Sequence, residues 1–172
     1  MASITLKDEK IVGERWAVLI ENGQGKAGQI YKDTEKYIRE TNAPGVEVEM
    51  VKAKTSWLKG LFGGERDYML VTTESLKDFR VLIGARDYGN NLDVHAFTTC
   101  EPGYFKKSFS SALSGGDEKA LSYALDIFQQ QDLSAFRTVV YGCLDKAANT
   151  LTQSLNQDLS KIQQKQKGFL GI

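Results

Sequence analysis

The chain's one histidine, His95, is the side chain best suited to proton transfer near neutral pH. Cys100 follows five residues later, directly after the end of the same predicted strand. Successive side chains of a strand alternate between its two faces, so the thiol and the imidazole would lie on opposite faces, about 16 Å apart. Asp93 shares the face of His95 and could orient its ring, although this spacing is equally typical of an ordinary polar sheet face. The pattern does not favour a cysteine–histidine nucleophile.

Other residue types that carry chemistry are too few or too scattered for a recognised centre. The G-x-S-x-G motif of many serine hydrolases does not occur. A structural zinc needs about four ligands at close spacings, whereas the chain offers one histidine and two distant cysteines, Cys100 and Cys143. Glu47 and Glu49 share one strand face, which indicates a solvated surface with cross-strand ion pairs. We therefore predict no catalytic residue, no cofactor and no metal.

The stretch ENGQGKAGQIY, residues 21–31, places Gly23, Gly25 and Gly28 in the order G-x-G-x-x-G between a predicted strand and a predicted helix. A dinucleotide site built on this motif needs a parallel strand–helix–strand unit, with an acidic residue that closes the second strand. Here the acidic residues alternate within that strand, and the next three strands follow with no helix between them. We interpret the glycines as a strand-to-helix corner rather than as a nucleotide site.

Hydrophobic periodicity predicts the elements that would position these residues. Apolar residues spaced three and four apart predict a helix over 27–41, which the sequence NAPG ends because proline cannot continue it. Strands are predicted over 11–20, 46–54, 66–73, 79–86 and 92–99. Short connections favour antiparallel neighbours, since a parallel crossover needs about a dozen residues. The expected fold is α+β: a five-stranded antiparallel sheet packed against helices, with a long C-terminal helix.

This order of elements, β-α-β4-α, resembles that of the helix-grip and TATA-box-binding-protein-like folds. The resemblance covers most of the chain and consists of element order, with no signature motif. It implies a curved antiparallel sheet packed on helices, and it implies no activity, because one fold hosts many functions. We predict a single domain over residues 1–165, followed by an apolar tail over 166–172.

Composition limits the class of protein. At 172 residues, with 41% hydrophobic and 26% charged residues, the chain resembles one ordinary soluble domain. The formal net charge is zero and neither half is basic, which argues against nucleic acid as a partner. No apolar run of about 18 residues and no apolar signal core occur, so we expect neither a transmembrane segment nor secretion. Two cysteines make no disulfide framework, which favours a reducing cytoplasm.

One apolar segment between two predicted strands stands out as a binding surface. Such connections usually run over the surface of a protein, and this one has the sequence SWLKGLFGGERDY, residues 56–68. Its apolar side chains either cover one end of the core or form a lip for a partner or ligand. They are Trp57, Leu58, Leu61 and Phe62.

The C-terminal part of the chain is the second such surface. Apolar residues from Leu133 to Ile162 recur at helical spacing over about 30 residues, which would make a helix of about 45 Å. Because strands of about nine residues are shorter, such a helix would overhang its sheet and bind a second copy, or fold back as a hairpin near Gly142 or Asn149. We favour self-association, through Leu151, Leu155, Leu159 and Ile162.

The chain ends in KGFLGI, in which Phe169, Leu170 and Ile172 are unusual residues to leave in water. They either dock on the same domain or tether another protein. The Leu-Gly-Ile core is similar to the cargo-loading peptides of encapsulin shells, a resemblance that covers only the last five residues.

These observations favour a non-enzymatic, cytoplasmic binding or assembly module that self-associates or docks a protein partner. The alternative is a carrier or sensor of an apolar small molecule, held in a cavity between the sheet and the long helix. An enzyme ranks third, because no group of residues commits the chain to catalysis.

Overall fold

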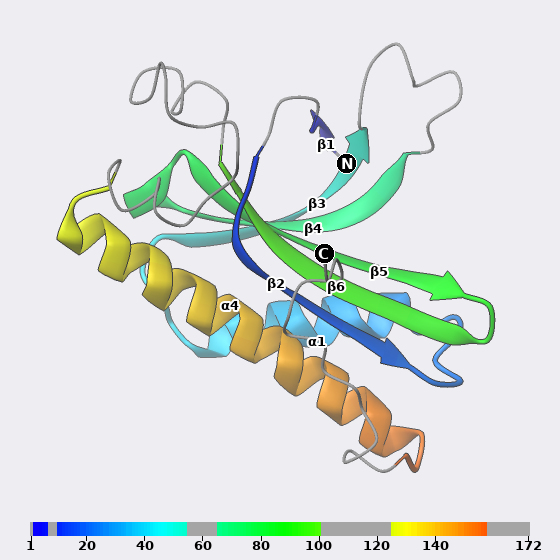
Figure 1. The fold of residues 1–172 in the computed structure, drawn as a ribbon. Helices are drawn as coiled ribbons and strands as arrows, with labels where there is room; N and C mark the ends of the chain where they lie inside the picture. Colours follow the sequence, from blue (N-terminus) through cyan, green and yellow to red (C-terminus); the bar gives the residue numbers. More distant parts are fainter. Residues whose placement is uncertain (1, 7–9, 55–64, 101–124, 158–172) are drawn as a thin grey trace, which may run out of the picture.

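The computed structural model describes residues 2–6, 10–54, 65–100 and 125–157. Within these residues the chain forms a sheet and two long helices, coloured along the sequence in Figure 1. The strands are β1 (Ala2–Thr5), β2 (Lys10–Ile20), β3 (Val46–Lys54), β4 (Arg66–Thr73), β5 (Phe79–Tyr88) and β6 (Asn91–Cys100). The helices are α1 (Ala27–Glu40) and α4 (Ile127–Ser154), with one 3-10 turn, η2 (Glu74–Leu76), between β4 and β5.

The six described strands form one mixed sheet in the order β1-β3-β4-β5-β6-β2 (Figure 1). Neighbouring strands are antiparallel except β1 and β3, which run parallel from Ala2 opposite Val51 to Thr5 opposite Lys54. Within the described residues β1 and β2 each have one neighbour, so they are the two edges of the sheet.

The expectation of a five-stranded antiparallel sheet in β-α-β4-α order is wrong. The omitted strand is β1, whose four residues are too few to show a periodic pattern and are placed by parallel pairing with β3. The chain is α+β, but its described elements follow a β-β-α-β4-α order, so the resemblance to helix-grip and TATA-box-binding-protein-like folds loses its basis. The five strands that periodicity predicted begin and end within two residues of the observed bounds.

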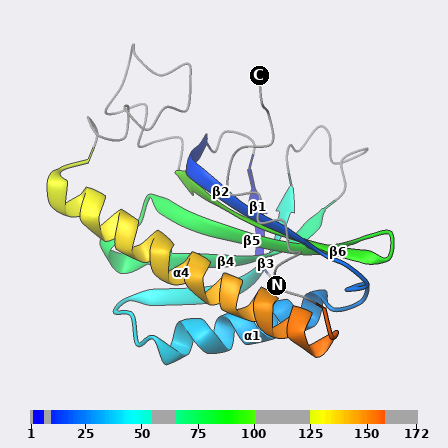
Figure 2. The ribbon, with the colours of Figure 1, turned by 60° about the horizontal axis from the view of Figure 1, so that its bottom comes forward.

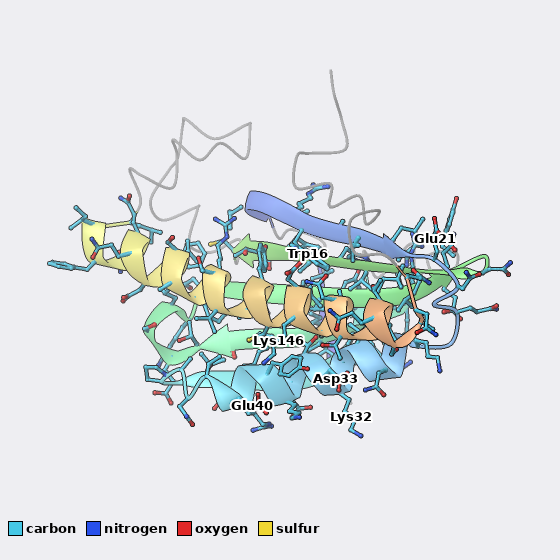
Figure 3. All side chains as sticks on the ribbon, turned by 90° about the horizontal axis from the view of Figure 1, so that it is seen from below. Trp16, Glu21, Lys32, Asp33, Glu40 and Lys146 are labelled. Atoms are coloured by element: carbon cyan, nitrogen blue, oxygen red, sulfur yellow. The ribbon has the colours of Figure 1, made fainter. Side chains whose placement is uncertain are left out.

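Both helices lie side by side on the same face of the sheet (Figures 1 and 2). The main core lies between this face and the helices, and it includes Ile30 of α1, Phe79 of β5 and Leu144 of α4, none more than 1% exposed. Seen from the helix side, Lys146 of α4 reaches toward α1 (Figure 3), where its ammonium group lies 4.0 Å from the centre of the Tyr37 ring.

The long helix packs against the chain's own core over most of its length. Its 28 residues span about 42 Å, and its buried positions run from Leu133 to Thr152. Leu151 is 4% exposed, and Leu155 at the C-cap packs against the same core. Because α1 lies beside α4 and enlarges the surface that α4 can cover, no exposed overhang begins at Leu151.

A capping box starts α4 before the apolar stripe begins. The Asp126 carboxylate accepts the N–H groups of Phe128 and Gln129, both at 2.9 Å. In return the Gln129 side-chain oxygen accepts the Asp126 N–H at 3.1 Å. This reciprocal pairing satisfies N–H groups that the first turn of a helix leaves without partners.

The glycine-rich segment between β2 and α1 is held by the hairpin that joins β5 and β6. Gly25 has a φ of +77°, in the region that favours glycine, and its N–H donates to Asp87 Oδ1 at 2.9 Å. The Gln24 N–H donates to the Asn90 carbonyl at 3.2 Å. In the sheet, three strands separate β2 from β3, so α1 does not connect adjacent parallel strands. This geometry is that of a strand-to-helix corner.

Candidate binding site

The candidate site lies where the neighbouring strands β4 and β5 separate. Their ladder of paired residues ends with Met69 opposite Ile83. Both strands continue beyond this point, because β4 stays paired with β3 as far as Arg66 and β5 stays paired with β6 as far as Tyr88. At this end the described sheet is therefore divided into two halves, β1-β3-β4 and β5-β6-β2.

The hydroxyl of Tyr31 takes the place of the missing ladder. The register of the paired residues, if continued, would place Asp67 opposite Ala85. Instead the Ala85 N–H donates to the Tyr31 oxygen at 2.8 Å. The Tyr31 hydroxyl lies 3.1 Å from the Asp67 carbonyl and 3.2 Å from the Ala85 carbonyl, and either can accept its proton. One phenol thus bonds backbone groups of both strands that separation would leave unpaired.

The position of Tyr31 affects its ionisation. Burial raises the pKa of Tyr31 above its ordinary value, because the charged phenolate is disfavoured away from water. The bond from the Ala85 N–H acts in the opposite direction and is the smaller effect. Tyr31 therefore stays a neutral donor and acceptor across the physiological pH range.

Charge gives a physical reason for the separation. One step beyond Asp67 and Ala85, the same register would bring Arg66 directly opposite Arg86. Like charges on directly opposed residues destabilise a ladder. Arg86 instead turns to β6, where its Nε donates to Asp93 Oδ2 at 3.0 Å. Arg66 has no ion pair with any carboxylate of the described residues.

On the sheet face away from the helices, three rings pack together over Gly84. His95 is the ladder partner of Gly84, and a Cβ at position 84 would collide with the His95 ring and lie 2.8 Å from Tyr68 Cε1. The Tyr68 ring packs edge-on against His95 and Phe97, with centroids 5.7 and 5.9 Å apart, and the His95 and Phe97 rings are stacked. The close approach of these rings therefore requires glycine at position 84.

Polar contacts at both ring nitrogens fix the orientation of His95. Nδ1 lies 3.4 Å from Asp93 Oδ2, and Nε2 lies 3.2 Å from the Tyr68 hydroxyl. The hydrogen bond with His95 lowers the pKa of Asp93 below its ordinary value; partial burial opposes this effect and the bond from Arg86 adds to it. Asp93 is therefore ionised at neutral pH, and it contacts the ring with which it shares a strand face.

A cavity of about 470 Å³ opens between the separated strands, and we call it the slot. Its size falls in the range of small-molecule sites, about 300–1,000 Å³. Its apolar and aromatic walls come from α1, β3, β4 and β5, namely Ala27, Gly28, Tyr31, Met50, Tyr68, Gly84 and Ala85. Its charged and polar groups are Arg66, Asp67, Arg86 and His95.

Two other open hollows lie beside the connection from α1 to β3, with volumes of about 560 and 760 Å³. Both are lined by Asn42, Ala43 and Val46 and by the surfaces next to that connection. They are larger than the slot, but neither contains an interrupted strand ladder or a pair of guanidinium groups. The convergence of apolar walls with a few placed polar groups identifies the slot as the candidate site.

The structure brings together few of the residues that the sequence singled out. His95 and Asp93 meet in the wall of the slot. Cys100 and Cys143 are buried and form no disulfide, and Cys100 belongs to the core beneath the helices, on the face opposite His95. The Cys100 and His95 side chains therefore lie on opposite faces of β6, as the alternation of strand side chains predicts.

Most of the predicted partner-binding residues lie outside the described residues, so their role stays a prediction. They are Trp57, Leu58, Leu61, Phe62, Leu159, Ile162, Phe169, Leu170 and Ile172. Of the remaining two, Leu151 is buried in the chain's own core and Leu155 packs against it. The bounds of the predicted domain and tail, 1–165 and 166–172, stay predictions for the same reason.

Sequence reasoning missed the residues that make the slot. Tyr31 belongs to the apolar stripe of α1, so its hydroxyl received no role of its own. Gly84, within the run VLIGAR, was the available signal, because glycine inside a strand often marks a close approach of other groups. Arg66 and Arg86 become a pair only once the register between β4 and β5 is known.

Comparisons of the chain with models of protein families, with curated proteins and with solved structures found no match. Among the described residues, no group of three or more His, Cys, Asp or Glu side chains could hold a metal ion. Neither α1 nor α4 is both long and apolar enough to cross a membrane. A functional proposal therefore depends on the geometry of the slot.

Proposed function

We propose that the chain is a non-enzymatic binding module that holds a small organic molecule in the slot. The observation that carries this proposal is the replacement of the β4–β5 ladder by the Tyr31 hydroxyl. Because Tyr31 bonds the backbone of Asp67 and Ala85, the strands need not close on each other when no ligand is bound. A pocket that is already formed binds its ligand without the free-energy cost of opening the sheet.

This proposal moves the ligand away from the place that the sequence suggested for a carrier. The space between the sheet and the long helix is filled by side chains of both, including Val81, Ile83, Val140 and Leu144, all of them 0% exposed. The slot lies between two strands instead, and it is reached by α1 rather than by α4.

The contacts of His95 favour a structural role over catalysis. A general base must reach the proton of a substrate, whereas both nitrogens of His95 are engaged, by Asp93 and by the Tyr68 hydroxyl. Tyr68 is itself only 7% exposed. We assign this chain of contacts to one wall of the slot, where it fixes the position of two rings.

Docking of a protein partner, or of a second copy, stays a prediction. Light scattering tests it directly, because a monomer at high concentration would remove the support for self-association. A cytoplasmic location is also part of the proposal, and it is supported by two buried cysteines that form no disulfide.

The methionine methyl groups offer a direct test of the proposed function. The chain has three methionines, at positions 1, 50 and 69; Met50 lines the slot and Met69 is 1% exposed in the core. With ¹³C-labelled methyl groups, 2-naphthoate and its neutral analogue 2-naphthalenemethanol serve as flat probes. We expect saturable movement of the Met50 signal, assigned through Met50→Leu, with little change at Met69.

Two glycine variants make a matched control for this experiment. Gly28 lines the slot and Gly142 is exposed on α4; in both helices a Cβ added at the glycine meets no atom outside the adjacent helix backbone within 4 Å. Gly28→Leu should fill the slot and abolish the response, whereas Gly142→Leu should preserve it. No response of Met50 to either probe, or an equal response in both variants, would contradict the proposed function.

A further inference from the structure

We propose that the slot selects an organic anion: a flat, mainly apolar molecule that carries one carboxylate. This inference rests on the proposed function, and it adds the charge and shape of the ligand. It follows from the placement of Arg66 and Arg86, from the charges around them and from the rings that line the slot.

The two arginines flank the slot from opposite strands. By strand alternation Arg66 lies on the same face as Tyr68, and Arg86 lies on the same face as Gly84. The bond to Asp93 uses the Nε of Arg86, and a guanidinium has four further N–H donors. A carboxylate placed between the two groups would accept hydrogen bonds from both and would offset the mutual repulsion of the two guanidinium groups.

The nearby carboxylates do not cancel this positive charge. Asp67 lies 3.5 Å from the ammonium group of Lys52, and Glu65 lies 2.7 Å from that of Lys54. Asp93 is shared by Arg86 and His95. Asp87, the residue after Arg86, accepts the N–H of Gly25. Of the four basic groups Lys52, Lys54, Arg66 and Arg86, Arg66 is the one that has no carboxylate partner among the described residues.

The start of α1 adds to the preference for an anion. Ala27 and Gly28 of its first turn line the slot, and that turn contains no acidic residue. The N-cap residue, Lys26, makes no side-chain cap, and the nearest carboxylate in contact with this segment is that of Asp87, which accepts the N–H of Gly25 two residues before the helix begins. The helix N-terminus adds to the preference for an anion that the two arginines create, and it would not indicate a site without them.

The shape of the ligand follows from the walls. The slot lies between two strands of one sheet, and its walls include the Tyr31 and Tyr68 rings and the thioether of Met50. Aromatic rings and methionine sulfur both make favourable contacts with flat aromatic groups. A fused or single ring that bears a carboxylate therefore matches the apolar walls and the arginines together.

The test compares the affinities of 2-naphthoate and 2-naphthalenemethanol, which differ mainly in charge, by titration of the Met50 methyl signal. We expect 2-naphthoate to bind at least about fivefold more tightly. Arg66→Gln should weaken 2-naphthoate about three- to tenfold and leave 2-naphthalenemethanol within about twofold. Arg39→Gln, on an exposed part of α1 where Arg39 pairs with Glu35, is the control and should change neither affinity.

The outcomes separate the two proposals. If both probes bind at Met50 with equal affinity, or if Arg66→Gln weakens them equally, the charge selectivity is wrong and the binding function stands. If neither probe moves the Met50 signal of the unmodified protein, both proposals are wrong. Arg86→Gln gives a second measurement, with circular dichroism to show that the variant stays folded without its contact to Asp93.

Discussion

Removal of a single oxygen from Tyr31 should destabilise the protein measurably. In Tyr31→Phe the ring remains, but the Ala85 N–H loses its acceptor at 2.8 Å, and the carbonyl that accepts the hydroxyl proton, of Asp67 or of Ala85, loses its donor. A buried donor left without a partner costs about 1–3 kcal/mol, and because this site is only partly buried we expect about 1–2 kcal/mol. For a chain of this size the loss corresponds to a fall in Tm of roughly 2–8 °C.

Tyr37→Phe is the matched control for this change. Tyr37 lies on the same helix, and its hydroxyl is 3.3 Å from the Thr150 hydroxyl in an exposed contact. Its loss should cost no more than about 0.5 kcal/mol, because water can replace the partner. Urea unfolding gives both free energies, and amide hydrogen exchange should show faster exchange at Ala85 in Tyr31→Phe alone. Equal stabilities of the two variants would refute the role assigned to Tyr31.

Four further predictions follow from the same contacts. Gly84→Ala should cost about 1–3 kcal/mol through overpacking, and most of that cost should disappear in the background of His95→Ala, a coupling that a double-mutant cycle measures. The pKa of Asp93 is lowered by folding, so the stability advantage of the unmodified protein over Asp93→Asn should be present just above the ordinary pKa of 3.8 and shrink as the pH falls below it. The pKa of Tyr31 is raised, so its stabilising effect should be complete below about pH 10 and decline at higher pH, a decline that Tyr31→Phe should lack. Asp126→Ala should cost about 1 kcal/mol by removing the cap of α4, whereas Asp132→Ala, six residues later in the same helix, should cost less than half of that in thermal unfolding.

The elements of the fold could be predicted because their patterns are local. The alternation in VEVEMVKAK and the helical spacing in AGQIYKDTEKYIRE are each fixed by the residues of one segment. β1 could not be predicted in this way, since ASIT has no pattern of its own and is a strand only through its pairing with β3. The packing of α4 likewise depends on α1, which lies beside it. The predicted overhang came from comparing the length of the helix with the length of the strands, and that comparison did not include α1.

The slot could not be predicted because it is a product of register. Arg66 and Arg86 lie 20 positions apart in the sequence, and only the β4–β5 pairing shows that they would oppose each other. Tyr31 reaches these strands from a helix, so its role requires the three-dimensional arrangement. The contact between Asp93 and His95 was within reach of sequence reasoning, because residues two apart in a strand share a face.

The position of the bound molecule tests the proposed binding function most directly. Intermolecular nuclear Overhauser effects can be recorded between the ring protons of 2-naphthoate and the methyl groups of Met50 and Met69 in the saturated complex. We predict strong effects to Met50 and to the Tyr31 ring, none to the buried Met69, and loss of all of them in Gly28→Leu. Saturable binding with no effect at Met50 or Tyr31 would place the ligand elsewhere and would contradict the assignment of the slot as the binding site.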